Sequence, residues 1–237
     1  MRKSQLQTAT PRRGAAAWIC AGLLLLAPLA STAQQELRDS AGHRLGWHFS
    51  LQYGAPRIVL LPHQPGDYNI RKAIARKLLH LRCNVYIPEL PDLYFNPHAA
   101  PDSLLKLLHR VVTDITRHDE PSSVLLVGAG RSAALAMMAA TTDFRVKQVI
   151  AISPGEYFEP PNAVQRVVGR LRVPLLVLYA PHESTTMRTL CLQVPKELII
   201  FSPTLHHTGY QTLLLDQPES GPAWLAISIF YSEQFGR

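Results

Sequence analysis

Side chains that could act together in acyl transfer occur in order along the second half of the chain. They are a hydroxyl at Ser132, a carboxylate at Glu183 and a pair of imidazoles at His206 and His207. A hydroxyl is a poor nucleophile at neutral pH, so a neighbouring imidazole must take its proton. The imidazole in turn needs a carboxylate on its far nitrogen, which fixes the tautomer and stabilises the imidazolium. We expect His207 to face the site because Gly209 turns the chain just after it, and His206 is the alternative.

The serine lies close to a sharp turn that the sequence predicts between a strand and a helix. Residues 123–127 favour β-structure, residues 128–130 read Gly-Ala-Gly, and a small-residue helical pattern begins at Ser132. A nucleophile at such a corner usually stands in the pattern G-x-S-x-G, with the serine at the tip. Here the tip position holds Gly130, which offers no nucleophile.

Two other alignments of this corner stay open beside that one. If the pattern slides by two residues, residues 130–134 read G-x-S-x-A and put Ser132 at the tip, but the strand must then continue through Gly128 and Ala129, which are poor strand residues. The corner also matches G-x-G-x-x-A, a dinucleotide-binding pattern. That pattern needs an acid at the end of the next strand, where Ser153 stands, so we expect no cofactor. Of the three alignments, we favour the one that puts Gly130 at the tip.

Strands and helices alternate along the chain, which predicts an α/β fold with a mostly parallel sheet and helices on both faces. The expected strands are 47–53, 57–62, 84–89, 123–127, 146–153, 173–179 and 197–202. The expected helices are 69–81, 102–118, 132–140, 161–169, 185–192 and 218–235. Ligands of such sheets bind beyond the carboxyl ends of the strands, so the residues just after each strand should form the site.

The strand-end residues together resemble those of the α/β-hydrolase superfamily, over about residues 57–235. Residues 60–63 look like the strand that enters the oxyanion loop, and residues 172–183 look like the strand that ends on the triad acid, with Glu183 in the place of the acid. The histidine pair follows the last strand, where that superfamily keeps its histidine. The order of nucleophile region, acid and histidine is also the same.

The resemblance implies roles for residues around the corner. Backbone N–H groups of Arg131 and of the loop at His63 and Gln64 would hold an oxyanion. Only residues 154–172 separate two expected strands at the place where hydrolases often carry a lid, so we expect a minimal fold with little or no lid. Aromatic residues of the strand-end loops would line an apolar pocket or anchor the loops: Tyr94, Phe95, Tyr157 and Phe158.

Residues 1–33 are typical of a secretory signal peptide. Basic residues precede an apolar run at residues 15–30, and residues 31–33 supply the small side chains of a cleavage site. The run is shorter than the roughly 20 residues that span a bilayer. We therefore expect a mature domain of residues 34–237, with no transmembrane span, in the periplasm or outside the cell. Arg12 and Arg13 suggest the twin-arginine route, but the residues that follow fit it poorly, so we favour the Sec route.

Charge and cysteine content argue against other classes of function. The formal charge is +7, and removal of the four basic residues of the leader leaves 20 basic and 17 acidic residues. No basic run is interleaved with aromatics, so we expect no nucleic-acid binding. Cys83 and Cys191 lack metal-ligand spacing to another Cys or His, so we expect two buried thiols and no metal site.

Two functions from different classes follow. The first is an exported serine hydrolase of carboxylic esters or related acyl compounds, which uses Ser132, Glu183 and His207. The second is an inactive hydrolase-like protein that serves as a binding or assembly protein of the bacterial envelope. The expected partner is accordingly a small acyl substrate or an envelope protein. The identity of the residue at the tip decides between them.

Overall fold

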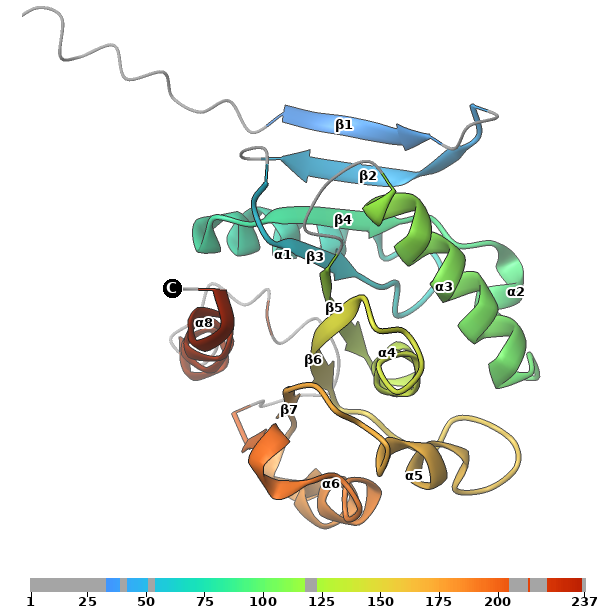
Figure 1. Cartoon of the computed structure of the whole chain (residues 1–237), viewed down its shortest axis with the longest axis vertical. Coiled ribbons are helices and arrows are strands. Elements are labelled where there is room, and N and C mark those ends of the chain that lie inside the picture. Colours follow the sequence, from blue (N-terminus) through green and yellow to red (C-terminus); the bar gives the residue numbers. More distant parts are fainter. Residues whose placement is uncertain are drawn as a thin grey trace, which may run out of the picture. The chain divides into compact units, whose positions relative to one another are not determined.

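The computed structural model describes residues 33–38, 42–50, 54–117, 123–204, 213 and 221–235, all of which lie in the unit Thr32–Arg237. These residues form an eight-stranded sheet in the order β1-β2-β4-β3-β5-β6-β7-β8 (Figure 1). The strands are β1 (Ala33–Arg38), β2 (Arg44–Ser50), β3 (Arg57–Leu60), β4 (Asn84–Pro88), β5 (Val124–Ala129), β6 (Val146–Ile152), β7 (Leu175–Leu178) and β8 (Ile199–Ser202). Both β1–β2 and β2–β4 pair antiparallel, and the strands from β4 to β8 are parallel. The predicted α/β class with a mostly parallel sheet is confirmed.

Helices cover both faces of the sheet, as predicted. They are α1 (Tyr68–Leu78), α2 (Asp92–Phe95), α3 (Pro101–Thr116), α4 (Arg131–Ala139), α5 (Ala163–Val168), α6 (Ser184–Leu190) and α8 (Gly221–Phe235). One hydrophobic core joins the sheet to α1 and α8, and a second joins its other face to α3, α4, α5 and α6 (Figure 1). Between β6 and β7 the described chain carries α5 and loops, which agrees with a minimal fold with little or no lid.

The centre of the sheet is β5, which lies between β3 and β6 and is buried along its whole length. Its side chains alternate between the two cores: Leu125 and Val127 pack with α1 and α8, whereas Val124 and Leu126 pack with α3 and α4. A strand that is covered on both faces needs apolar residues at every position. This requirement explains the continuous apolar run that identified β5 in the sequence.

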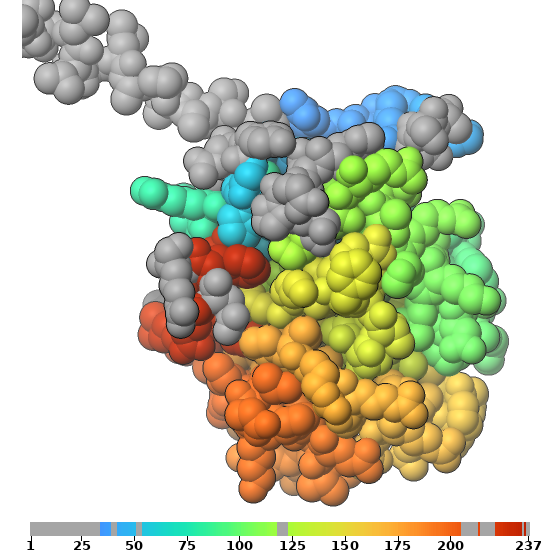
Figure 2. All heavy atoms as spheres, in the orientation of Figure 1, coloured from blue at the N-terminus to red at the C-terminus, as the bar shows by residue number. Residues whose placement is uncertain are grey.

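The ends of several elements differ from the expected ones. β5 continues through Ala129, two residues beyond the predicted end, because β6 pairs with Gly128 and Ala129. The sequence did not predict β1, whose polar residues lie at the edge of the sheet (blue in Figure 2). The short helix α2 was also not predicted.

Two further observations concern the described residues as a whole. Cys83 and Cys191 are free and buried, and burial raises the pKa of each thiol to about 12. Among the described residues, no helix is both long and apolar enough to cross a membrane.

The buried carboxylate of Asp143 ties the turn after α4 to α3. Arg145 donates from Nε to Oδ1 at 2.9 Å and from Nη2 to Oδ2 at 2.8 Å, and its Nη1 reaches Thr113 Oγ1 on α3 at 2.7 Å. His109 Nδ1 lies 3.1 Å from Asp143 Oδ2. Burial acts to raise the pKa of Asp143, but the hydrogen bonds and charge of Arg145 outweigh it and hold the pKa below its usual value.

Replacement of Asp143 by Asn should lower the free energy of unfolding by about 1–3 kcal/mol at neutral pH, because a buried guanidinium loses its partner. The folded pKa of Asp143 lies below the unfolded one. The stabilisation is therefore present above pH ~4 and disappears as the pH falls through the folded pKa. Urea unfolding at several pH values should show a difference between variant and wild type that shrinks in acid.

Asp114→Asn is the matched control, because Asp114 forms a surface ion pair with Arg117 at 3.2 Å. Exposed pairs contribute little, so this variant should differ from the wild type by less than about 1 kcal/mol at every pH. If Asp143→Asn lowers the free energy of unfolding by the same amount throughout the acid range, the lowered pKa of Asp143 is contradicted.

Candidate functional site

A single residue, Gly130, forms the sharp turn between β5 and α4. The strand ends at Ala129 and the helix begins at Arg131. Gly130 has φ +56° and ψ −122°, a conformation that side-chain-bearing residues rarely adopt. Gly128 is needed just before the turn, because a Cβ there would lie 2.6 Å from the backbone of Ser132. The structure therefore places glycine, and not Ser132, at the tip of the corner.

Ser132 lies in the first turn of α4 and is only 2% exposed. Its Oγ donates a hydrogen bond to the carbonyl of Pro62 and accepts one from Tyr94 Oη at 2.8 Å. Burial raises the pKa of Tyr94, so the phenol remains a neutral donor. These bonds join α4 to the end of β3 and to α2. The predicted role of Ser132 as nucleophile stays a prediction, and the use of its hydroxyl in packing argues against it.

The imidazole of His63 occupies the space in front of the tip. A Cβ built on Gly130 would lie 3.0 Å from His63 Cε1 and 3.3 Å from Nδ1, with Tyr157 Oη at 3.7 Å. His63 Nδ1 lies 3.1 Å from the carbonyl oxygen of Ala129, which can only accept, so Nδ1 carries a proton. A side chain at Gly130 would therefore meet the ring of His63, an exposed residue of the loop after β3, which would have to move by a few tenths of an ångström.

That loop is held in place by the carboxylate of Asp67. Its Oδ2 accepts from the backbone N–H of His63 at 2.7 Å and of Gln64 at 3.3 Å. Its Oδ1 accepts from Arg71 Nε at 2.6 Å, and Arg71 Nη1 donates to the carbonyl of Pro88 at 2.9 Å. Both side chains of this ion pair are buried. The two loop N–H groups that the resemblance assigned to an oxyanion therefore already have an internal acceptor.

The acid keeps its expected place at the end of β7. Glu183 belongs to the 3₁₀ turn Pro181–Glu183, and its Oε2 accepts from the backbone N–H of Ala180 at 2.8 Å and from Ser153 Oγ at 2.9 Å. Ser153 has φ +46° at the end of β6. Burial and then the nearby charge of Glu183 raise the pKa of Tyr157, so the phenol and the carboxylate lie near one another.

The structure thus brings Gly130, His63, Tyr157 and Glu183 together at the carboxyl edge of the sheet. His206 and His207 lie outside the described residues. Within the described ranges, no group of three His, Cys, Asp or Glu side chains could hold a metal ion.

Sequence reasoning missed two residues that shape this site. Asp67 follows a Pro-Gly turn and is not itself a strand-end residue, so its pattern indicated only a loop. Ser153 was noticed only because no acid stood at the end of β6. Its contact with Glu183 depends on β6 and β7 being neighbours in the sheet. Neither role has a local signal in the sequence.

Comparison with known proteins relates the fold, but not the sequence, to hydrolases. No family model matches the chain, and no curated protein matches it by sequence. A putative dienelactone hydrolase from Klebsiella pneumoniae is similar in structure, with a TM-score of 0.67 and 13% identity over 85% of this chain and 98% of that one. A dienelactone hydrolase from Anabaena variabilis gives a TM-score of 0.62 and 16% identity over 86% and 98%. An esterase from Pyrococcus furiosus gives 0.60 and 12% over 99% and 100%.

At these identities the matches establish the fold alone. The described part of the chain has an α/β-hydrolase-like fold, with an eight-stranded, mostly parallel sheet and helices on both faces. The matches extend over nearly the full length of the similar structures. The activity of this chain has to be argued from its own residues.

Replacement of Gly130 by Ala should destabilise the fold by about 1–3 kcal/mol, because the residue has positive φ and the new methyl group would press on the ring of His63. Gly54→Ala is the matched control. Gly54 has φ +74° but no atom within 4 Å of its Cβ position, so its variant measures backbone strain alone. Urea unfolding should show the larger loss for Gly130→Ala.

Gly130→Ala should lower the free energy of unfolding by a smaller amount when His63 is also replaced by Ala, because the ring then no longer opposes the methyl group. A double-mutant cycle over Gly130→Ala and His63→Ala measures this coupling. Additive losses within experimental error would show that His63 does not occupy the space in front of Gly130.

Proposed function

We propose that this chain is an exported hydrolase-fold protein that binds its ligand non-covalently at the carboxyl edge of the sheet, with no acyl-enzyme step. The observation that carries the proposal is the identity of the residue at the tip and the side chain that lies against it. Gly130 supplies no nucleophile, and the ring of His63 lies against the position that a Cβ would take there. A covalent mechanism needs a nucleophile within reach of a base at that position.

The state of the oxyanion loop supports the same proposal. An oxyanion hole stabilises charge only when its donors are aimed at the position of the developing oxyanion. Here the N–H groups of His63 and Gln64 point at the carboxylate of Asp67, which Arg71 anchors from the other side. Release of these donors would leave Oδ2 of the buried Asp67 without hydrogen bonds, which costs about 1–3 kcal/mol.

A cavity beside the tip supports a small molecule over an envelope protein as the ligand. It has a volume of about 510 Å³, and its walls are residues 97–101 and 156–159. Cavities of about 300–1,000 Å³ are typical of small-molecule sites. Tyr157 lines this cavity, and its Oη lies 3.7 Å from the Cβ position of Gly130, so the cavity is adjacent to the carboxyl edge of the sheet.

A serine hydrolase that uses Ser132, Glu183 and His207, or His206 in its place, is the second candidate. The carboxylate of Glu183 favours it, because one oxygen is fixed by Ala180 and Ser153 as a triad acid would need. The fold similarity to dienelactone hydrolases and an esterase also favours it. This mechanism requires the hydroxyl of Ser132 to leave Pro62 and Tyr94.

Reaction of the purified mature chain with a fluorophosphonate probe distinguishes the two candidates. We expect no labelling of the wild type, and the same result for Ser132→Ala, while an active serine hydrolase in the same reaction is labelled. Gly130→Ser should also stay unlabelled, because the N–H groups of His63 and Gln64 bind Asp67 and do not form an oxyanion hole. Labelling that is lost in Ser132→Ala would establish the hydrolase and overturn the non-covalent proposal.

Export to the periplasm rests on the leader, and the position of β1 is compatible with it. Cleavage after Ala33 leaves residues 34–38 of β1, which pair with β2. When the full chain is produced with a carboxyl-terminal tag in a Gram-negative host, the tagged protein should be in the periplasmic fraction with Gln34 as its first residue. Ala33→Arg should block the cleavage, because the −1 position needs a small side chain. An intact leader on cytoplasmic wild-type protein would contradict export.

A further inference from the structure

Arg131, the residue after the tip, uses only part of its guanidinium. Its Nη1 donates to the carbonyl of Tyr94 at 2.8 Å. Its Nε and Nη2 are buried and have no hydrogen-bond partner among the residues that the structure describes. The N–H bonds of Nε and Nη2 point in the same direction, and together they form the fork that binds a carboxylate through two parallel hydrogen bonds. One complete carboxylate-binding edge of Arg131 is therefore unused.

The charge of Arg131 is also uncompensated. No Asp or Glu of the described residues forms an ion pair with it. It is the first residue of α4, where the partial charge of the helix dipole is positive and disfavours a cation. Burial lowers the pKa of Arg131, as expected for a cation that loses water without gaining an acid. An anion at this position would offset both the unfavourable helix dipole and the burial of an unpaired cation.

The ring of Phe158 stacks on the guanidinium and shields it. The centre of the ring lies 5.1 Å from Arg131 Cζ, within the range of a cation–π interaction. Phe158 is 7% exposed and lies in the loop between β6 and α5. This contact stabilises the face of the guanidinium, but it provides no acceptor for the edge formed by Nε and Nη2.

The cavity beside the tip is built from the same two segments that contact Arg131. One wall, residues 97–101, follows α2, whose Tyr94 carbonyl accepts from Arg131. The other wall, residues 156–159, contains Phe158. Phe158 thus both lines the cavity and stacks on the guanidinium of Arg131.

We propose that Arg131 is the binding residue for a ligand that is a small apolar molecule with a single carboxylate group. The carboxylate forms two hydrogen bonds with Nε and Nη2, and the apolar part lies in the cavity against Tyr157 and Phe158. A single negative charge fits better than a phosphate dianion. Arg131 is one cation, the nearby Arg71 is already paired with Asp67, and Glu156 and Glu159 line the cavity.

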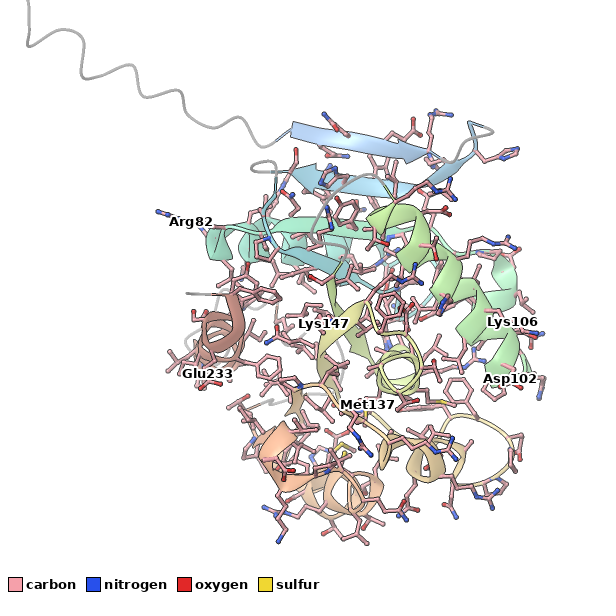
Figure 3. The ribbon with its side chains drawn as sticks, viewed as in Figure 1. Arg82, Asp102, Lys106, Met137, Lys147 and Glu233 are labelled. Atoms are coloured by element: carbon pink, nitrogen blue, oxygen red, sulfur yellow. The ribbon has the colours of Figure 1, made fainter. Side chains whose placement is uncertain are left out.

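A second cavity supplies a control residue for Arg131. A cavity of about 590 Å³ lies between α3 and the end of α4, and Asp102 and Lys106 of α3 line it (Figure 3). Its charged residues of both signs are solvated and include Arg110. Arg110 therefore serves as an exposed arginine with which Arg131 can be compared.

Calorimetric titration of the mature chain, residues 34–237, with benzoate tests the proposal. Benzoate should bind to the wild type, and Arg131→Gln should weaken the binding roughly tenfold to hundredfold, the loss expected for charge-assisted hydrogen bonds. Arg110→Gln should bind benzoate as the wild type does. Benzamide, a neutral molecule of the same shape, should bind at least roughly tenfold more weakly than benzoate. Phe158→Ala should remove the shield and leave the preference for benzoate intact.

Several results would overturn the proposal: no benzoate binding to the wild type, equal binding by Arg131→Gln, equal binding of benzamide, or tighter binding of inorganic phosphate. If Arg131→Gln fails to fold, the wild type is used instead. The Nε–H resonance of Arg131 should then shift on addition of benzoate, and an unchanged resonance overturns the proposal.

The inference rests on the ligand cavity of the proposed function. Fluorophosphonate labelling reports on covalent chemistry and benzoate binding on Arg131, so the two proposals can fail separately.

Discussion

The close contact between β5 and the beginning of α4 is the constraint on which the rest of the site depends. At Gly128 even a methyl group would lie 2.6 Å from helix backbone, so the chain must reverse through one residue. That residue, Gly130, takes a backbone conformation that favours glycine. Once the turn is set, Arg131 must begin the helix and Ser132 must face the interior, because successive residues of a helix are about 100° apart.

The corner has the order of strand, one-residue turn and helix, and the groups around it form contacts within the protein. The N–H groups of the loop after β3 bind Asp67, and His63 lies against the tip. The hydroxyl of Ser132 is part of the packing between α4 and α2. The carboxylate of Glu183 remains oriented at the end of β7. Among the described residues, this edge of the sheet carries one oriented acid, Glu183, and one shielded guanidinium at Arg131.

Most of the sheet could be predicted because its central strands are buried on both faces, and this burial forces apolar runs that are visible in the sequence. The elements that were missed have weaker signals. β1 is a polar edge strand, whose pairing with β2 supplies most of its stability, and α2 is a single helical turn after a proline. The end of β5 was misplaced by two residues, because the low strand propensity of Gly128 is overridden by its pairing with β6.

The sequence by itself determined the order of the chemical groups, the glycine at the corner and an acid after β7, since each is written in a local pattern of a few residues. Only the tertiary structure decided what those groups contact. His63 and Gly130 meet because β3 and β5 are neighbours in a parallel sheet, and Ser153 reaches Glu183 because β6 lies beside β7. The unused edge of Arg131 likewise emerges only when α2 and the loop after β6 close around it. Contacts between segments distant along the chain depend on strand order and register, which no local pattern of residues encodes.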